Sequence, residues 1–210
     1  MTRTVVHLLR HGEVENPDKI MYGRLPGFHL SARGRQMVER SAKYLLDRDI
    51  TYLVSSPLER ARESAAPLAA ALGLEIHIDD RLIEGANHFE GTRVGDGPRF
   101  LLDPRCWPRL WNPVRPSWGE PYLAMAARMW VAATAARDGA AGHEAVCVSH
   151  QLPIWMLRRY LEGGRLWHDP RKRQCALASV TSLTFDGDRV VDIAYAEPAG
   201  GDPAGHVPGA

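Results

Sequence analysis

The sequence is poor in the features that mark secreted, membrane-spanning and nucleic-acid-binding proteins. It has three cysteines in 210 residues, and this odd, widely spaced set indicates free thiols in a reducing cytoplasm rather than a disulfide framework or a zinc knuckle. No apolar run is long enough to cross a bilayer, and the run at 5–9 is too short for the hydrophobic region of a signal peptide. The formal net charge is only +1, which argues against a nucleic-acid or membrane-surface partner. We therefore expect a cytoplasmic protein that binds neither nucleic acid nor membranes.

Several phosphate-handling motifs are also missing. There is no glycine-rich loop of the Walker type. A phosphatase with a cysteine nucleophile needs an arginine six positions after its cysteine, but those positions hold Asn112, Pro153 and Thr181. The histidines show no metal-ligand spacing, so we expect neither a metal ion nor another cofactor.

What is present is an ordinary globular composition, with 45% hydrophobic and 24% charged residues. Apolar runs typical of strands alternate with amphipathic helical patterns, which predicts an α/β fold, a three-layer sandwich with a mostly parallel central sheet. We expect a single domain over residues 1–196, in which the tryptophan- and proline-rich segment 86–118 forms an insert or lid. The segment 197–210, rich in glycine, proline and alanine, is expected to be a flexible tail. The expected strands are 4–9, 50–54, 75–78 and 145–149 with a hairpin over 177–185 and 189–195, and the expected helices are 32–48, 57–72, 120–137 and 152–161.

Two of the predicted helices begin with capping signals. Ser31 is expected to cap the first helix. Ser56 is expected to cap the second, with Pro57 at its first position and Glu59 completing a capping box. Gly73 is expected to end that second helix.

The run 183–190 is similar to the magnesium-dependent motif of haloacid dehalogenases, because Asp186 and Asp188 follow an apolar strand. That motif, however, belongs at the first strand, with a domain's length of chain after it. An Asp-Gly pair between two β-like runs is typical of a hairpin turn. We therefore predict a hairpin here.

Polar side chains follow the ends of the predicted strands. Arg10 and His11 come directly after the first strand, and Arg60 opens the helix after the second. Glu84 lies in the loop after the third strand, and His150 follows a later one. Because the carboxyl ends of parallel strands meet at one edge of a sheet, we expect these side chains to converge there.

Such a set of side chains is suited to phosphoryl transfer without a metal. Arg10 and Arg60 would neutralise the phosphate oxygens, and a neutral His11 would attack phosphorus. The nearby guanidinium charges favour that neutral state because they lower the pKa of a histidine. His150 would donate a hydrogen bond to the transferring group, and Glu84 would protonate the leaving oxygen and then deprotonate the attacking water.

Three segments, in the same order, resemble the histidine phosphatase superfamily, the clan of cofactor-dependent phosphoglycerate mutases and their phosphatase relatives. They are Arg-His-Gly-Glu at 10–13, Ser-Ser-Pro-Leu-Glu-Arg-Ala-Arg-Glu-Ser-Ala at 55–65, and Val-Cys-Val-Ser-His at 146–150. The resemblance extends from Val5 to about Leu161. It implies a phosphoglycerate mutase-like fold.

The resemblance also implies a role for each candidate residue. By this likeness, His11 is the phosphorylated histidine and Glu84 is the proton donor. The residues that would bind the phosphate are Arg10, Arg60, His150 and Asn16.

Some assignments have alternatives. Asp79, Asp80 and Glu90 compete with Glu84 for the role of proton donor. Asn16 suits a simple turn about as well as a phosphate contact.

The sequence also departs from the family pattern. Gln151 stands where many relatives have glycine, and the loop after Glu13 is one residue shorter than in the mutases. These departures bear on the substrate more than on the chemistry. Arg24 either reaches the substrate or is a solvated loop arginine, and His7 is packed in the first strand or exposed.

We expect a metal-independent phosphatase that hydrolyses a small-molecule phosphomonoester through a phosphohistidine on His11. One alternative is a phosphoglycerate mutase-type isomerase, and another is a non-catalytic phosphate-binding module. The resemblance implies that a mutase would be a longer chain with a larger insertion than this one, which favours the phosphatase. The tryptophans of segment 87–118 suggest an apolar or aromatic leaving group, and nothing in the sequence indicates the oligomeric state.

Overall fold

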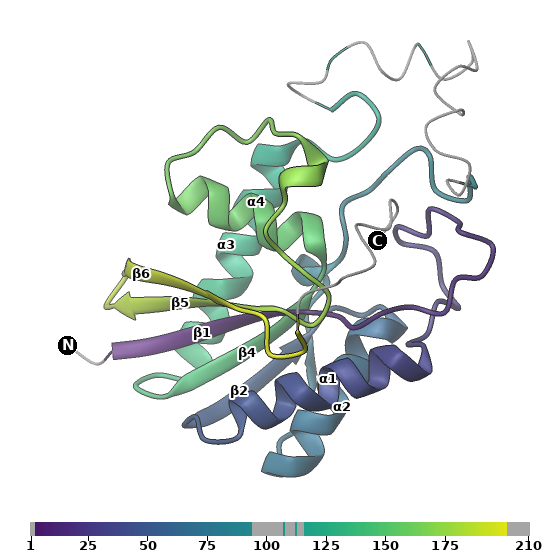
Figure 1. The fold of residues 1–210 in the computed structure, drawn as a ribbon. Helices are drawn as coiled ribbons and strands as arrows, with labels where there is room; N and C mark the ends of the chain where they lie inside the picture. Colours follow the sequence, from purple (N-terminus) through teal and green to yellow (C-terminus); the bar gives the residue numbers. More distant parts are fainter. Residues whose placement is uncertain (1–2, 94–106, 108–111, 113–115, 201–210) are drawn as a thin grey trace.

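The computed structural model describes residues 3–93, 107, 112 and 116–200, and its centre is a six-stranded sheet (Figure 1). The strand order is β3-β2-β4-β1-β5-β6, with β1 to β4 mutually parallel and β5 and β6 antiparallel to their neighbours. The predicted α/β fold with a mostly parallel sheet is therefore confirmed. The strands are β1 (Arg3–Arg10), β2 (Ile50–Ser55), β3 (His77–Ile78), β4 (Glu144–Ser149), β5 (Val180–Asp186) and β6 (Arg189–Ala196).

Helices cover both faces of the sheet (Figure 1). Along β1, Leu8 packs in a buried cluster with residues of α3 and α4, whereas Leu9 packs in a second cluster with residues of α1 and α2. Successive side chains of a strand point to opposite faces, so these two clusters are the outer interfaces of a three-layer sandwich. The helices are α1 (Ala32–Leu45), α2 (Glu59–Leu72), α3 (Tyr122–Gly139) and α4 (Gln151–Leu161), with short 3₁₀ turns η1 (Asp80–Leu82) and η4 (Pro170–Lys172).

The helix boundaries match the capping signals at two positions and differ at a third. Ser31 caps α1 by accepting a hydrogen bond from the backbone of Gly34, and Gly73 ends α2 in the left-handed region at a φ of 66°. The predicted cap at Ser56 is wrong, because α2 begins at Glu59 and its capping residue makes no side-chain hydrogen bond. The Ser56 hydroxyl lies 2.8 Å from Nε2 of His150, and it also accepts a hydrogen bond from the Leu58 amide over 3.4 Å, ahead of the helix.

The predicted hairpin is confirmed. β5 and β6 pair antiparallel on either side of Gly187, whose φ is 58°. Asp186 and Asp188 are exposed in this turn, and Asp188 forms an ion pair with Arg137. The aspartates therefore lie in a surface turn, as the hairpin interpretation requires.

The structure describes only parts of the predicted tail (197–210) and of the predicted insert or lid (86–118). Within the predicted tail, Ala199 is buried in a cluster with Leu30 and Met37, and its carbonyl accepts a hydrogen bond from Arg40. The flexible tail over 197–210 stays a prediction, and 201–210 lie outside the described part of the chain. Most of the predicted insert at 86–118 lies outside it as well.

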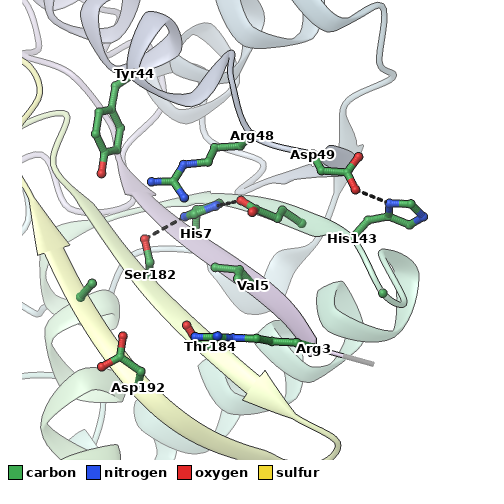
Figure 2. A pocket seen from close by; sticks show the side chains of 13 residues that line it. Arg3, Val5, His7, Tyr44, Arg48, Asp49, His143, Ser182, Thr184 and Asp192 are labelled. Atoms are coloured by element: carbon green, nitrogen blue, oxygen red, sulfur yellow. Dashed lines mark hydrogen bonds and ion pairs between the residues drawn. The ribbon is translucent and has the colours of Figure 1, made fainter. Parts of the chain in front are cut away.

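His7 lies on β1, three residues before Arg10, and Figure 2 shows its side chain near Ser182 and Arg48. It is buried, with Nδ1 2.8 Å from the Ser182 hydroxyl and Nε2 2.6 Å from the Glu144 carboxylate. It lines a cavity of about 430 Å³ that also contains Arg48 and Tyr44. Of the two interpretations of His7, the packed one is correct. In the described part of the chain, no helix has the length and apolarity that a membrane crossing needs.

Candidate active site

Four candidate side chains meet at the carboxyl edge of the parallel strands. Arg10 ends β1 and His11 follows it, Arg60 is the second residue of α2, and His150 directly follows β4. All four are at most 4% exposed, and the rings of His11 and His150 lie 5.1 Å apart between centroids. The order of parallel strands thus brings together residues that are up to 140 positions apart (150 − 10).

Backbone contacts hold His11 in place. Its amide donates to the Ser149 carbonyl of β4 over 3.1 Å, and its own carbonyl accepts from the Ala178 amide over 3.2 Å. The next amide, that of Gly12, donates to the Ser64 hydroxyl of α2 over 3.1 Å. His11 is therefore fixed by contacts from three other parts of the chain.

One ring nitrogen of His11 forms a hydrogen bond, and the other has no hydrogen-bond partner. Nδ1 lies 2.8 Å from the Gly12 carbonyl, an acceptor, so Nδ1 carries the proton and Nε2 carries the lone pair. Burial lowers the pKa of His11 well below 6.5, and the charges of Arg60 and Arg10 lower it further. His11 is therefore neutral, with Nε2 in the state that a nucleophile requires.

Each of the other three residues is held by one contact and keeps unpaired atoms. Arg10 donates from Nη1 to the Cys175 carbonyl over 2.6 Å, and Arg60 donates from Nη2 to the Gly23 carbonyl. His150 is held through Nε2 by the Ser56 hydroxyl. Among the described buried side-chain atoms without a hydrogen-bond partner are Arg10 Nε, His11 Nε2, Arg60 Nε and Nη1, and His150 Nδ1.

This concentration of unpaired atoms is informative because each one destabilises a fold. A buried polar atom without a partner costs about 1–3 kcal/mol, more if it is charged. The unpaired nitrogens of Arg10, Arg60 and His150 surround Nε2 of His11. Together they form a site for an anion with several oxygen atoms. Phosphate fits this description, since its oxygens accept several hydrogen bonds at once while its phosphorus faces the nucleophile.

Tyr22 was missed as a candidate by the sequence reasoning. The guanidinium of Arg60 lies 4.8 Å from the centroid of the Tyr22 ring, and that ring lies edge-on to His11 at 6.5 Å. Tyr22 is buried, which raises its pKa to about 12. An uncharged ring thus stacks on the arginine and orients it. No sequence signal distinguishes this tyrosine from an ordinary core residue.

Glu84 is buried beside these cations. It is 9% exposed, and its Oε1 accepts a hydrogen bond from the Gly85 amide over 2.7 Å. Burial raises the pKa of Glu84, against the opposing effects of the Gly85 hydrogen bond and the charges of Arg60 and Arg173. A raised pKa favours the protonated carboxyl that a general acid needs.

The three competing acids have other surroundings. Asp79 forms an ion pair with Arg81, with 2.6 Å between Oδ2 and Nη2, and Asp80 is exposed. Glu90 accepts hydrogen bonds from the backbone amides of Arg24 and Asn87 and is only partly buried. Glu84 is therefore the one of the four whose carboxyl is both buried and close enough to Arg60 and Arg10 to interact with their charges.

Arg24 is neither a solvated loop residue nor a described part of the anion site. Its Nε donates to the Glu84 carbonyl over 2.7 Å, and its Nη2 lies 3.0 Å from the Glu120 carboxylate. Arg128 also pairs with Glu120, at 2.7 and 2.9 Å, and donates to the Glu84 carbonyl over 3.4 Å. The two arginines and the carboxylate between them fix the backbone from which Glu84 extends.

Asn16 occupies a turn. Its side-chain nitrogen donates to the Ile20 carbonyl over 2.8 Å, and its side-chain oxygen accepts from the Ile20 amide over 2.9 Å. None of its described hydrogen bonds joins it to the four clustered residues. A contact between Asn16 and phosphate therefore stays a prediction from the resemblance.

The described part of the chain contains no cluster of three or more histidine, cysteine, aspartate or glutamate side chains that could hold a metal ion. A cavity of about 320 Å³ adjoins the site at Glu84. It is lined by apolar and aromatic side chains that include Met21, Trp118 and Leu152, together with Arg173. Glu84 therefore adjoins both the cavity and the clustered residues Arg60 and Arg10.

The sequence matches a known family over this whole arrangement. The profile of the histidine phosphatase superfamily (branch 1) matches residues 6–196, a range that contains every residue of the cluster. The chain belongs to this superfamily. Its likeness to that family is therefore established on the same segments that carry Arg10, His11, Arg60 and His150.

Individual members of the histidine phosphatase superfamily are similar to this chain to different degrees. The chain is 61% identical over 196 residues to uncharacterized protein Rv0525 of Mycobacterium tuberculosis, covering 93% of this chain and 97% of that protein. It is 29% identical over 182 residues to the probable phosphoglycerate mutase GpmB of Escherichia fergusonii, covering 83% of each chain. Among solved structures, Bacillus stearothermophilus YhfR has a TM-score of 0.74 at 25% identity, covering 89% of this chain and 94% of that one. Mycobacterial glucosyl-3-phosphoglycerate phosphatase Rv2419c has a TM-score of 0.68 at 26% identity, covering 92% and 96%.

The buried neutral histidines are expected to make the protein less stable in acid. The pKa values of His11 and His150 are held well below 6.5, chiefly by burial and then by Arg60. Below about pH 6.5 the unfolded chain binds protons on these rings while the folded protein does not. The free energy of unfolding should then fall by up to about 1.4 kcal/mol per pH unit for each ring.

Urea unfolding at pH 7.5, 6.5 and 5.5 measures this dependence. His11→Asn and His150→Asn each remove one titrating ring, so each variant should show a shallower decline than the parent protein. An identical decline in both variants and the parent would assign the acid sensitivity to other groups.

Proposed function

We propose that this member of the histidine phosphatase superfamily is a phosphoric monoester hydrolase that acts through a phosphohistidine on His11, with no metal ion. The observation that carries the proposal is the unpaired Nε2 of a neutral His11 buried among unpaired nitrogens of Arg10, Arg60 and His150. The substrate is a small phosphorylated molecule whose phosphate lies in that cluster.

In the first step, the Nε2 lone pair of His11 forms a bond to phosphorus as the bond from phosphorus to the ester oxygen breaks. Arg10, Arg60 and His150 bind the non-bridging oxygens, where charge spreads in the transition state. Glu84 gives its proton to the leaving oxygen, so the alcohol departs neutral. The proton of His11 stays on Nδ1, and its hydrogen bond to the Gly12 carbonyl supports the positive charge that develops on the ring.

In the second step, a water molecule attacks the phosphohistidine. Its oxygen bonds to phosphorus as the bond to Nε2 breaks, and its proton passes to the Glu84 carboxylate. The enzyme returns to its starting state and inorganic phosphate leaves. Two successive displacements at one histidine predict ping-pong kinetics.

A mutase is the second candidate, since the chain is 29% identical to a probable phosphoglycerate mutase. In a mutase the alcohol product stays bound and receives the phosphoryl group back at another hydroxyl. The structural likeness at 26% identity to a mycobacterial glucosyl-3-phosphoglycerate phosphatase supports hydrolysis. The complete set of Arg10, His11, Arg60, Glu84 and His150 favours either enzyme over a non-catalytic phosphate-binding module.

Hydrolysis of p-nitrophenyl phosphate in excess EDTA tests the proposal, together with rapid acid-free quenching of the enzyme mixed with ³²P-labelled substrate. We expect turnover that EDTA does not change, and labelled protein that is stable in alkali and loses its label in acid, as a phosphohistidine does. Loss of turnover in EDTA, or turnover without any labelled protein, contradicts the mechanism. Interconversion of phosphoglycerate isomers faster than phosphate release would instead identify a mutase.

A further inference from the structure

Arg173 is a further arginine beside the site, and it is not part of the phosphate cluster. It lies between η4 and β5 and lines the 320 Å³ cavity that Glu84 also lines. In the proposed reaction Glu84 protonates the leaving oxygen. Arg173 therefore lies on the side of the cavity where the alcohol part of the substrate departs.

Two neutral groups hold the guanidinium of Arg173. Its Nε donates to Nε2 of His168 over 2.8 Å, and its Nη1 donates to Oε1 of Gln151 over 3.2 Å. The other ring nitrogen of His168 lies 2.7 Å from the Leu166 carbonyl, so it carries the proton and leaves Nε2 as an acceptor. Burial lowers the pKa of His168, which agrees with this neutral state.

The positive charge of Arg173 is thus oriented but not neutralised by a direct partner. Within the described residues, no carboxylate forms an ion pair with it. Arg171, two positions earlier and lining the same cavity, has the opposite character. Its side chain is 85% exposed, and its Nε and Nη2 donate to the two carboxylate oxygens of Asp169 over 2.8 to 3.2 Å. Charges taken out of water are normally paired, so the unpaired one of these two arginines is the one suited to a ligand.

Gln151 connects Arg173 to the phosphate cluster. It is the first residue of α4 and the position at which the sequence departs from the glycine of many relatives. Besides accepting from Arg173, it donates from Nε2 to the Cys175 carbonyl over 3.3 Å. The same carbonyl accepts from Arg10. One glutamine side chain and one carbonyl therefore link the two arginines, which a glycine at position 151 could not do.

We propose that Arg173 binds a second anionic group, a carboxylate or a second phosphate, carried on the alcohol part of the phosphomonoester. This inference rests on the proposed phosphatase function and narrows its substrate class. The planar fork of an arginine matches either oxyanion. The apolar lining of the cavity at Met21 and Leu152 would contact the carbon skeleton between the two anionic groups.

A bound anion at Arg173 would also assist Glu84. The charge of Arg173 lowers the pKa of Glu84 and so opposes its protonated state. An anion on Arg173 offsets that charge and keeps the proton on Glu84 for the leaving oxygen. Substrates with the second anionic group are therefore expected to gain in kcat as well as in binding.

The test compares three matched series of phosphomonoesters with two to four carbons: ω-phosphooxy carboxylates, α,ω-bisphosphates and simple alkyl phosphates. We expect the wild-type enzyme to prefer one of the first two series, and that series identifies the anion. In Arg173→Gln the preference, measured as the ratio of kcat/KM values, should fall roughly 30-fold, as expected when one charge-assisted hydrogen-bonding partner is lost. In the matched control Arg171→Gln the preference should stay within about threefold.

Two results would overturn the inference: a wild-type enzyme with no preference for either anionic series, or an Arg173→Gln variant that keeps the full preference. Calorimetric binding of the same compounds to His11→Ala separates this inference from the proposed function, because it needs no turnover and no Arg173 substitution. Preferential binding of an anionic series without any hydrolysis by the wild type would contradict the phosphatase and leave the role of Arg173 standing. Hydrolysis by the wild type, with equal binding of all three series, would support the phosphatase and contradict the role of Arg173.

Discussion

His11→Ala is expected to lower kcat/KM for p-nitrophenyl phosphate by at least about 10⁴-fold and to abolish labelling of the protein from ³²P-labelled substrate. The loss is large because Nε2 of His11 is the group that bonds to phosphorus, and the neighbouring unpaired nitrogens belong to groups that cannot replace a neutral lone pair. Arg10 and Arg60 carry positive charge, and the open nitrogen of His150, Nδ1, donates a hydrogen bond to the phosphate in the proposed mechanism. The rate of p-nitrophenol release and the labelled protein are the two measurements.

His7→Gln is the matched control for this experiment. His7 is also a buried histidine and lies on β1, four residues before His11, but its side-chain contacts are Ser182 and Glu144 (Figure 2). Glutamine keeps a hydrogen-bonding side chain there, so kcat/KM should remain within about threefold. A His11→Ala variant that retains turnover above a few per cent, in protein as folded as the control by circular dichroism, would falsify the assignment of the nucleophile.

Glu84→Gln is expected to have an effect that depends on the leaving group. For a simple alkyl phosphate, whose alkoxide is a poor leaving group, kcat should fall roughly 10²- to 10⁴-fold because the departing oxygen receives no proton. For 2,4-dinitrophenyl phosphate, whose phenolate leaves without protonation, the fall in the rate of the first step should be less than about tenfold. Single-turnover kinetics with the two esters isolates that step.

The pH dependence gives a second measurement on the same variant. Burial raises the pKa of Glu84, and the acid works only while protonated, so the rate for alkyl phosphates should decline as the pH rises through that pKa. Glu84→Gln should lose this alkaline decline. Glu90→Gln changes an acid of the same loop whose carboxylate accepts backbone amides, and it should keep the decline. Equal losses for both esters, or the same pH profile in the Glu84 and Glu90 variants, would exclude Glu84 as the proton donor.

Local patterns in the sequence were sufficient for most of the architecture. The apolar runs 4–9 and 145–149 predict two buried strands, and the structure has them as β1 and β4. That these two strands are parallel neighbours is shown by the structure alone. Gly73 and Ser31 mark helix ends through backbone conformation and capping, which depend on neighbours within four residues. Features of this kind are readable from the sequence because the interactions that produce them are local.

The prediction at Ser56 failed for the opposite reason. Its local pattern satisfies a capping box, but α2 begins only at Glu59, and the Ser56 hydroxyl also contacts His150, which lies 94 positions later in the chain. A contact at that separation depends on how β2 and β4 pair, and nothing in the residues next to Ser56 encodes it. Arg24 is similar, because neither of its two interpretations included the contacts it makes with the Glu84 carbonyl and the Glu120 carboxylate.

By itself, the sequence determined the order of strands and helices, the residue types at the strand ends, and the expectation that Arg10, His11, Arg60 and His150 meet at one edge of a parallel sheet. The tertiary structure alone decided the state of those groups. Burial makes His11 neutral and raises the pKa of Glu84, and burial depends on what packs over a side chain from distant parts of the chain. The partners of the arginines were decided in the same way: Asp169 lies two residues from Arg171, whereas Arg173 reaches back 22 positions to Gln151. Which cations are neutralised and which remain for a ligand is thus a property of the folded chain, because it is set by distances that the linear sequence does not contain.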